Sequence, residues 1–482
     1  MNNFEFFSGE RTLMIAPAGY GKTHLIAAAI IENPTEKPHL VLTHTHAGIA
    51  SIRAKCSKLG GDPKLYKIET ISGFAQRFVL AFTKRDNLPS LSNDVYFDSI
   101  MKRALELFTI KSVRNIIRDS YSDIWVDEYQ DCSWMQHKMI MEMGQSLPIH
   151  IFGDPLQQIY TFSGTSVDFD KDLAGFSKSE LHTPMRWQIP GHSKELGEYI
   201  LNIREMLNNK EDIDLRSESC EQVQIEEIQD GLLPRGKSIY KFRKILSALE
   251  ENSVLVIIPA YSDRRKGNFS GRVNFKRQFD FKNEYFPIEA IDSKIYYRAA
   301  KCLDEFLLSL PNINIYSQLH ELLITLSFNK THINEWINKG RNSLVVKAKD
   351  VDEYNRLRQT LSSLQSEPSY ANLQKVIEFF ADKCGCSHEY LLKTIHKCFK
   401  ICEEGKTMYD CMCYIKNKVR MCGRKVDGKC IGTTLLTKGL EFDTVVIVDA
   451  DNIQDAKNFY VAISRACKKL IIFTQKTVLH FK

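Results

Sequence analysis

Two segments at opposite ends of the 482-residue chain carry residue types that bind nucleotide phosphates. One reads A-P-A-G-Y-G-K-T, and the other, F-Y-V-A-I-S-R-A, runs from Phe459 to Ala466. Glycines let the backbone N–H groups of a tight turn face phosphate oxygens, lysine reaches the outer phosphates, and threonine binds Mg²⁺. A distant arginine motif predicts that ATP is held between two lobes, so that hydrolysis moves one lobe against the other. The expected ATP-binding residues are Ala16, Pro17, Ala18, Gly19, Tyr20, Gly21, Lys22 and Thr23.

Two adjacent carboxylates, Asp127 and Glu128, follow an apolar strand-like run. Ligands of open α/β sheets bind at this carboxyl end of the strands. We expect Asp127 to hold Mg²⁺ together with Thr23, and Glu128 to orient and deprotonate the attacking water. A second run of the same design ends in G-D-P-L-Q-Q, where Gln157 is placed to report on the γ-phosphate.

The elements that must position these residues alternate between strands and helices. Residues 12–15 predict a strand, 22–32 a helix and 40–43 a second strand, which is the pattern of a parallel α/β unit. This context disfavours a chance Gly-Lys-Thr on a loop. Further strands are predicted at 124–126, 149–152, 254–258, 445–448 and 470–473. The predicted fold class is therefore α/β, with two doubly wound parallel sheets.

Helical spacing of apolar residues predicts two insertions into this α/β framework. The predicted order is a first lobe at 1–80 and 121–190 with a small helical insertion at 81–120, then a second lobe at 191–265 and 430–482 with a mostly helical insertion at 266–429.

Composition excludes several classes of protein. Hydrophobic residues make up 43% and charged residues 26% of the chain, as in ordinary globular proteins. The longest purely apolar run is too short to span a bilayer, and no secretory leader is recognisable, so we expect a cytoplasmic protein without a membrane partner. A net charge of +6 permits nucleic-acid binding but does not identify it.

Eight ordered stretches of the chain resemble the motifs of the UvrD/Rep/PcrA family of superfamily 1 helicases. Besides the two terminal segments they are T-H-T-H-A-G at Thr43, T-I-S-G-F at Thr70, D-E-Y-Q-D at Asp127, G-D-P-L-Q-Q-I-Y at Gly153, L-H-T-P-M-R at Leu181 and T-T-L-L-T-K-G-L-E-F at Thr433. The resemblance implies two RecA-like domains, ATP and Mg²⁺ as cofactors, and single-stranded DNA as partner.

The resemblance also implies roles for individual residues. Gln157, Arg186 and Arg465 would contact the γ-phosphate, where the fixed fork of arginine donors suits phosphate oxygens, and Glu441 would approach the ribose. The residues implied in contacts with single-stranded DNA are Thr43, His44, Thr70, Tyr160, Phe162, Thr433 and Lys438. Tyrosine and phenylalanine rings can stack on bases of any sequence, although Phe162 could equally pack in the core.

Several positions depart from the family pattern. No glutamine precedes Gln76 to read adenine, and Met185 replaces the usual tyrosine that stacks on it. Other departures are Pro17 for glycine, Ser72 and Leu435 for histidines, and Ser163 for arginine. Adenine selectivity and the distribution of DNA contacts are the properties affected.

Function is therefore expected to be ATP-dependent translocation or unwinding in the 3′ to 5′ direction. The short chain also resembles compact helicase-like subunits of anti-phage systems of the Gabija type, which implies defence or DNA repair and a partner nuclease. An alternative is a nucleic-acid-sensing ATPase that regulates such a nuclease without unwinding. A small-molecule kinase would explain the phosphate loop but not the distant arginine.

Two further segments allow more than one interpretation. Residues 261–282 mix lysine and arginine with phenylalanine, which fits either a single-strand binding segment or a solvated basic connector. Eight cysteines lie between 384 and 430, but no C-x-x-C pair occurs among them. This spacing favours buried thiols over a zinc or iron–sulfur site.

Overall fold

The computed structural model describes residues 3–84, 96–159, 167–217, 220–230, 238–259, 270–279, 284–288, 294–310, 315–346, 349–402, 405–422, 426, 428–453 and 455–481. The chain divides into two compact units, which are described one at a time. One unit joins Met1–Glu289 to Met421–Lys482, and the other is Ala290–Arg420. The domain boundaries given above stay a prediction.

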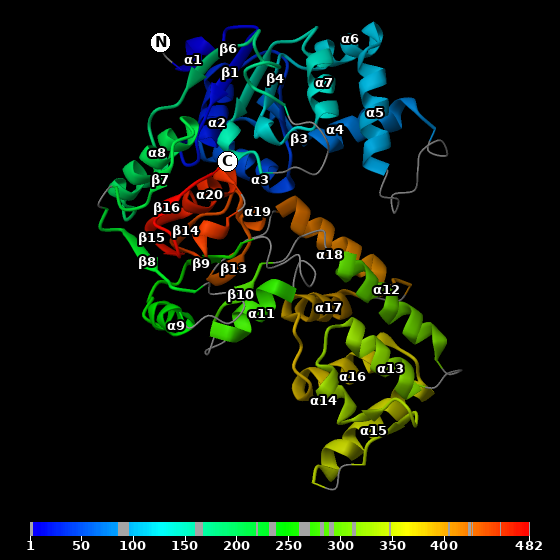
Figure 1. Ribbon diagram of the computed structural model, residues 1–482. Coiled ribbons are helices and arrows are strands. Elements are labelled where there is room, and N and C mark those ends of the chain that lie inside the picture. The colour runs from blue at the N-terminus through cyan, green and yellow to red at the C-terminus, as the bar shows by residue number, and fades with distance from the viewer. Residues whose placement is uncertain are drawn as a thin grey trace. The chain divides into compact units, whose positions relative to one another are not determined.

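The first sheet of the larger unit has six parallel strands in the order β3-β2-β4-β5-β1-β6 (Figure 1). Successive side chains of a strand point to opposite faces, so both faces of a buried strand are apolar. Leu13 of β1 packs with one helical layer and Met14 with the other. The strands are β1 Arg11–Ile15, β2 His39–Thr43, β3 Tyr66–Thr70, β4 Ile124–Val126, β5 Ile149–Gly153 and β6 Ser177–Glu180.

Helices cover both faces of this first sheet. On one face lie α2 Lys22–Glu32 and α3 His46–Lys58, with Phe7 after the short α1 Asn3–Phe6. The other face is covered by α4 Ile71–Phe82, α5 Tyr96–Phe108, α6 Lys111–Ser120 and α7 Trp134–Met143. The 3₁₀ turns of this region are η1 Pro63–Leu65, η3 Tyr129–Asp131 and η4 Pro155–Gln157.

The second sheet is also parallel, with six strands in the order β10-β13-β9-β14-β15-β8. Its strands are β8 Val223–Glu227, β9 Val254–Ile257, β10 Phe286–Pro287, β13 Lys429–Gly432, β14 Phe442–Ile447 and β15 Ala466–Thr474. One face packs on α8 Lys194–Asn208 and α20 Ala456–Ile463, the other on α9 Ile239–Ser247 and α11 Ser270–Phe279. The prediction of two doubly wound parallel sheets, the RecA-like fold class, is confirmed.

Smaller elements complete the larger unit. A two-stranded antiparallel sheet joins β7 Ile213–Asp214 to β16 Val478–Leu479. The remaining helical turns are η5 Met185–Gln188, α19 Thr434–Thr437 and η6 Ala450–Asn452. Within 261–282 only 270–279 is described, and there Phe275 and Phe279 are buried in the core beneath the second sheet. These two rings are therefore core residues.

The smaller unit is helical around one apolar core. Its helices are α12 Lys294–Ser309, α13 Ile315–Thr325, α14 Lys330–Asn334, α15 Val351–Ser366, α16 Tyr370–Lys383, α17 Glu389–Ile401 and α18 Met408–Cys422, with a hairpin of β11 Ile337–Asn338 and β12 Ser343–Leu344. Cys384, Cys398 and Cys411 are buried in this core. Among the described residues, no group of three or more His, Cys, Asp or Glu side chains is arranged to hold a metal ion.

No helix in the described part of the chain is long and apolar enough to cross a membrane.

Asp304 of α12 organises the polar centre of the helical unit. Its carboxylate accepts hydrogen bonds from the Tyr370 hydroxyl (2.6 Å) and from the backbone N–H groups of Met408 (2.8 Å) and Tyr409 (3.0 Å). Burial, and then the hydrogen bond to Asp304, raise the pKa of Tyr370. Asp304 therefore satisfies the first N–H groups of α18 from another helix.

We expect Asp304→Ala to destabilise the helical unit by about 2–4 kcal/mol, because three donors lose a buried acceptor. Hydrogen exchange of the α18 amides should become faster than in the unaltered chain. Glu305→Ala is the matched control, since Glu305 is exposed on the same helix and its ion pair with Lys301, at 3.8 Å, is also exposed. Equal exchange in both variants would contradict this role of Asp304.

Candidate nucleotide site and nucleic-acid contacts

The loop between β1 and α2 has the geometry of a phosphate cradle. Gly19 and Gly21 have φ angles of +81° and +79°, a left-handed conformation that favours glycine. Gly21 is the N-cap of α2 and offers no side chain to the first N–H groups of the helix. Those groups have no partner within a helix, so the helix start presents donors and a positive dipole end to an anion. Lys22 and Thr23 are the first two residues of α2.

The predicted acidic pair lies directly beside Lys22. The Lys22 Nζ atom is 2.5 Å from Glu128 Oε1 and 3.3 Å from Asp127 Oδ1. Glu128 has a φ of +56°, and its backbone N–H donates to the Asp127 carboxylate at 2.9 Å. This left-handed residue ends the β4 segment in a sharp turn that carries both carboxylates to the lysine.

Burial and charge act against each other at these three groups. Burial alone would lower the pKa of Lys22, but Asp127 and Glu128 outweigh it and raise the pKa above the ordinary lysine value. Burial would raise the pKa of Glu128, but Lys22 and then Lys438 outweigh it and lower the pKa to about 2. At Asp127 burial prevails over Lys22 and raises the pKa. Glu128 is therefore ionised at neutral pH, as a general base requires.

Gln157 is held by its neighbour Asp154. The Gln157 amide Nε2 donates to Asp154 Oδ2 at 2.8 Å, and both side chains are buried. The backbone N–H of Asp154 donates to Gln130 Oε1 at 3.0 Å, and Gln130 Nε2 donates to Glu128 Oε2 at 2.5 Å. A continuous hydrogen-bonded path therefore joins Gln157 to Glu128.

Both predicted arginines are buried, and Arg186 lies against the phosphate loop, whereas the contacts of Arg465 are with elements of the second sheet. The backbone N–H of Arg186 donates to the Gly19 carbonyl at 2.8 Å, and its guanidinium donates to the Ser464 carbonyl and to Glu441 at 2.8 Å. The guanidinium of Arg465 donates to the carbonyls of Val461 (2.9 Å) and Leu440 (3.2 Å).

Burial, and then repulsion by Arg186, lower the pKa of Arg465 to about 10, with a weaker opposing pull from Glu128. Glu441, expected at a ribose, pairs here with Arg186.

Residues of the second sheet reach the first sheet at further points. The Tyr460 hydroxyl, on α20, accepts a hydrogen bond from the Ala18 N–H at 3.2 Å. Lys438 lies 2.6 Å from Asp131 and donates to the Gln157 carbonyl at 2.7 Å. Burial raises the pKa of Asp131 to about 6, against the lowering effect of Lys438. The phosphate loop and Asp131 thus belong to the first sheet, whereas Tyr460 and Lys438, which contact them, belong to elements of the second.

The structure describes five of the seven residues implied in DNA contacts. Thr43 and Thr70 end the neighbouring strands β2 and β3, His44 follows Thr43, and Thr433 follows β13 of the second sheet. Thr43, Thr70 and Thr433 are buried, and Lys438 is engaged by Asp131. Tyr160 and Phe162 lie outside the described residues.

The residues present fit ATP and Mg²⁺. The loop around Gly19 supplies backbone donors, and a Cβ atom there would lie 2.9 Å from the Cβ of Arg186, so the chain passes as closely as glycine allows. Lys22 supplies a cation, and Asp127 with Thr23 supplies the oxygen ligands that Mg²⁺ prefers. Buried guanidinium groups of Arg186 and Arg465 complete the donor set.

Two functional candidates were missed from the sequence. Asp154 stood within a recognised stretch but was given no role, and Arg204 lies in α8, outside every motif. Arg204 donates to both Asp154 oxygens, at 2.8 and 2.9 Å. Only the charge of Arg204 among apolar helical neighbours could have marked it, because a buried charge needs a partner.

His44 carries a testable consequence of this electrostatic arrangement. Burial, and then repulsion by Lys438, lower the pKa of His44 to about 4. The unfolded chain binds the proton more readily, so stability is lost as the pH falls from about 6.5 to about 4. We expect His44→Gln to remove about 1–2 kcal/mol of this acid destabilisation at pH 5.

Thermal unfolding midpoints at pH 7.5 and pH 5 measure this effect. The drop between the two pH values should be smaller for His44→Gln than for the unaltered chain. His46→Gln, an exposed neighbour, should behave like the unaltered chain. An equal drop in all three proteins would count against a half-buried His44 that stays neutral at pH 5.

Comparison with known proteins gives one family match. The model of the UvrD/REP helicase N-terminal domain matches residues 86–172, less than half of the chain. This range contains Asp127, Glu128 and Gln157. A search of curated proteins finds no match.

Solved helicase structures resemble the chain only loosely. The arterivirus nonstructural protein 10 helicase is 9% identical, with 96% of this chain and 59% of that chain covered and a TM-score of 0.36. The Pif1 helicase from Bacteroides, in complex with ADP-AlF3 and ssDNA, is 12% identical, with 96% and 88% covered and a TM-score of 0.32. This chain spans less than two thirds of the length of the arterivirus proteins that it matches.

Residues 86–172 are therefore similar to the UvrD/REP helicase N-terminal domain, and this match includes the acidic pair and Gln157 but neither the phosphate loop nor the two arginines.

Proposed function

We propose that the chain is an ATP-driven motor that moves along single-stranded DNA in the 3′ to 5′ direction. The observation that carries this proposal is the contact of the phosphate loop with arginine-bearing elements, through Arg186 N–H to Gly19 and Ala18 N–H to Tyr460. A nucleotide site built from elements of both sheets changes its geometry when one sheet moves relative to the other. The direction rests on the resemblance of the motifs to relatives with that polarity.

Each residue of the site has a proposed task. Lys22 and the loop N–H groups bind the phosphates, and Thr23 with Asp127 holds Mg²⁺. Glu128 accepts the proton of the attacking water, and Gln157 contacts the γ-phosphate. Arg186 and Arg465 would stabilise charge that develops there, and Glu441 would leave Arg186 for the ribose. ATP supplies the phosphoryl group whose transfer to water releases the free energy for movement.

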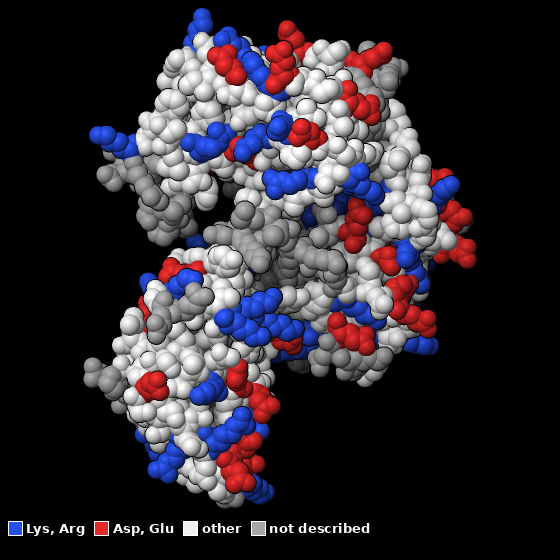
Figure 2. Space-filling model, turned by 180° about the vertical axis from the view of Figure 1, so that it is seen from behind, with Lys and Arg blue, Asp and Glu red and all other residues white. Residues whose placement is uncertain are grey.

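We infer that DNA passes along the carboxyl ends of the strands. Thr43 and Thr70 end parallel neighbours of one sheet, and Thr433 follows a strand of the other, so these residues lie at equivalent edges. On the face seen in Figure 2 both basic and acidic side chains are spread over the described surface, so charge on that face alone does not mark the path.

A second candidate is a nucleic-acid sensor that licenses a partner nuclease without unwinding duplex. The observation that favours it is Lys438, whose side chain is 7% exposed and paired with Asp131. DNA would have to break this internal pair, which suits a switch. The defence or repair role, with a nuclease partner, rests on the resemblance to helicase-like subunits of anti-phage systems. DNA-stimulated hydrolysis without strand separation would select the sensor, and unwinding by the isolated chain would select the motor.

The Glu128 assignment is tested by Glu128→Gln. We expect kcat for ATP to fall about 10²- to 10³-fold, because the amide cannot accept the proton of the attacking water. ATP binding, measured with a fluorescent analogue, should be retained. Glu106→Gln, an exposed site on α5, is the matched control and should keep full turnover. Rapid hydrolysis by Glu128→Gln would refute the assignment of the base.

The motor itself is tested by ATP turnover with and without single-stranded DNA. We expect about tenfold stimulation or more, equivalent to a lowering of the activation free energy by about 1.4 kcal/mol. Lys22→Ala should be inactive in both conditions. GTP should be hydrolysed comparably, because Met185, which lies beside Gly21, replaces an adenine-stacking ring. Turnover indifferent to DNA would contradict the proposal and favour a small-molecule kinase.

A further inference from the structure

Arg204 is a buried cation that none of the recognised motifs contains. Its side chain is 5% exposed, on a helix whose Leu196, Ile200 and Ile203 pack in the core of the second sheet. Its partner Asp154 is fully buried at the end of β5 in the first sheet. A buried ion pair therefore joins the two sheets beside the nucleotide site.

Asp154 also forms hydrogen bonds that lead to the predicted catalytic groups. Its carboxylate accepts from Arg204 and Gln157, and it also accepts from the Leu156 N–H at 3.2 Å. A carboxylate only accepts, so the Gln157 amide nitrogen must face Asp154 and the amide oxygen must face away. The orientation of Gln157 therefore depends on Asp154, which in turn depends on Arg204.

The same argument fixes Gln130. Its amide oxygen accepts from the Asp154 N–H, a pure donor, and its amide nitrogen donates to Glu128, a pure acceptor at neutral pH. Gln130 thus has one possible orientation. Its two hydrogen bonds link the position of Asp154 to that of the proposed base, Glu128. We call Arg204, Asp154, Gln157, Gln130 and Glu128 the Asp154 network.

Arg204 also contacts the residue that touches the phosphate loop. Its guanidinium lies 5.2 Å from the centre of the Tyr460 ring, and Tyr460 accepts from the Ala18 N–H. Attraction by Asp154 and then by Tyr460 outweighs burial and raises the pKa of Arg204. The Arg204 guanidinium therefore contacts both Asp154, which follows β5, and Tyr460 on α20. Tyr460 in turn contacts the loop that would bind phosphate.

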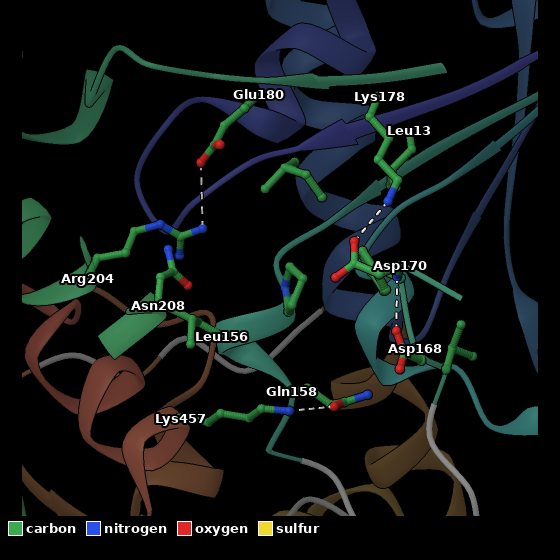
Figure 3. Close-up of a pocket in the computed structure, with 14 residues that line it drawn as sticks. Leu13, Leu156, Gln158, Asp168, Asp170, Lys178, Glu180, Arg204, Asn208 and Lys457 are labelled. Atoms are coloured by element: carbon green, nitrogen blue, oxygen red, sulfur yellow. Dashed lines mark hydrogen bonds and ion pairs between the residues drawn. The ribbon is translucent and has the colours of Figure 1, made fainter. Parts of the chain in front are cut away.

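A cavity beside Arg204 leaves this side chain room to move. Its volume is about 480 Å³, and Arg204, Asn208, Glu180 and Lys457 are among its lining residues (Figure 3). Figure 3 shows Arg204 directed towards Glu180, and the two charged groups are 3.8 Å apart. Arg204 can therefore keep a carboxylate partner if the second sheet shifts relative to Asp154.

We propose that Arg204 is a positioning residue. Its contact with Asp154 lets the position of the second sheet determine the orientation of Gln157 and, by way of Gln130, that of Glu128. Closure of the two sheets brings Arg204 onto Asp154 and aligns the network. Separation releases Asp154 and leaves Gln157 unaligned. This inference rests on the proposed function, because it assigns regulation to that same site.

The test is a double-mutant cycle on ATP turnover with single-stranded DNA present. Arg204→Met should lower kcat about tenfold while KM and the binding of a fluorescent ATP analogue stay within about threefold, because Arg204 would act on alignment and not on binding. Arg204→Lys keeps a cation near Asp154 and should lose less. Adding Arg204→Met to Asp154→Ala should cost at most about twofold more than Asp154→Ala alone, since Arg204 acts on both Gln157 and Gln130 through Asp154.

Arg216→Met is the matched control. Arg216 is also paired, with Glu227, but its side chain is 57% exposed and lies outside the network, so kcat should not change. A merely structural role of Arg204 would instead multiply the losses of the two changes in the double variant, and that result would overturn the proposal. So would full turnover by Arg204→Met.

If Arg204→Met fails to fold, the same cycle is run with Arg204→Lys, and failure of both variants to fold would also overturn the proposal. Failure of the proposed function looks different, because the unaltered chain would then show no stimulation by DNA.

Discussion

The buried carboxylate of Asp154 is the constraint on which the arrangement of the site depends. An ionised carboxylate loses its hydration on burial, and only a cation with several donors makes that loss tolerable. Asp154 obtains a cation from the second sheet and an amide and a backbone N–H from its own side. The place of one sheet is thereby tied to the orientation of groups on the other.

Ion pairs of this kind suit a contact that has to open and close. The attraction within a buried pair is largely offset by the desolvation of its two charges, so the net stabilisation is small, whereas removal of one partner is costly. Arg204 with Asp154, and Lys438 with Asp131, both follow this pattern between the sheets. Apolar helical layers pack within each sheet, and one further apolar cluster joins Ala18, Tyr20 and Leu156, from loops of the first sheet, to the second sheet. Movement of the sheets would therefore exchange charged partners and also change this apolar contact.

The sequence predicted the buried parts of the fold better than its edges. The central strands β1, β2, β4, β9 and β14 are continuous apolar runs and were recognised, and helix α2 was predicted with its observed bounds. Strands β3, β6, β8, β10 and β13 of the two sheets were missed. All but β13 lie at a sheet edge, and K-I-E-T, S-K-S-E and V-Q-I-E-E mix polar residues into β3, β6 and β8. An edge strand has one neighbour and a solvated side, so its pattern resembles that of a loop.

The same limit applies to the site and explains the conformation of Glu128. Local motifs identified the lysine, the carboxylates and the arginines, but pairing across the chain, such as Arg204 with Asp154, leaves no local pattern. A left-handed backbone at a glutamate costs of order 1 kcal/mol, so glycine would be the easier residue there. The cost is offset because the Glu128 N–H binds Asp127, its carbonyl accepts from Asp131, and its side chain meets Lys22 and Gln130. The proposed role of Glu128 as the base gives a reason for a carboxylate at this strained position, and the surrounding hydrogen bonds hold it in place.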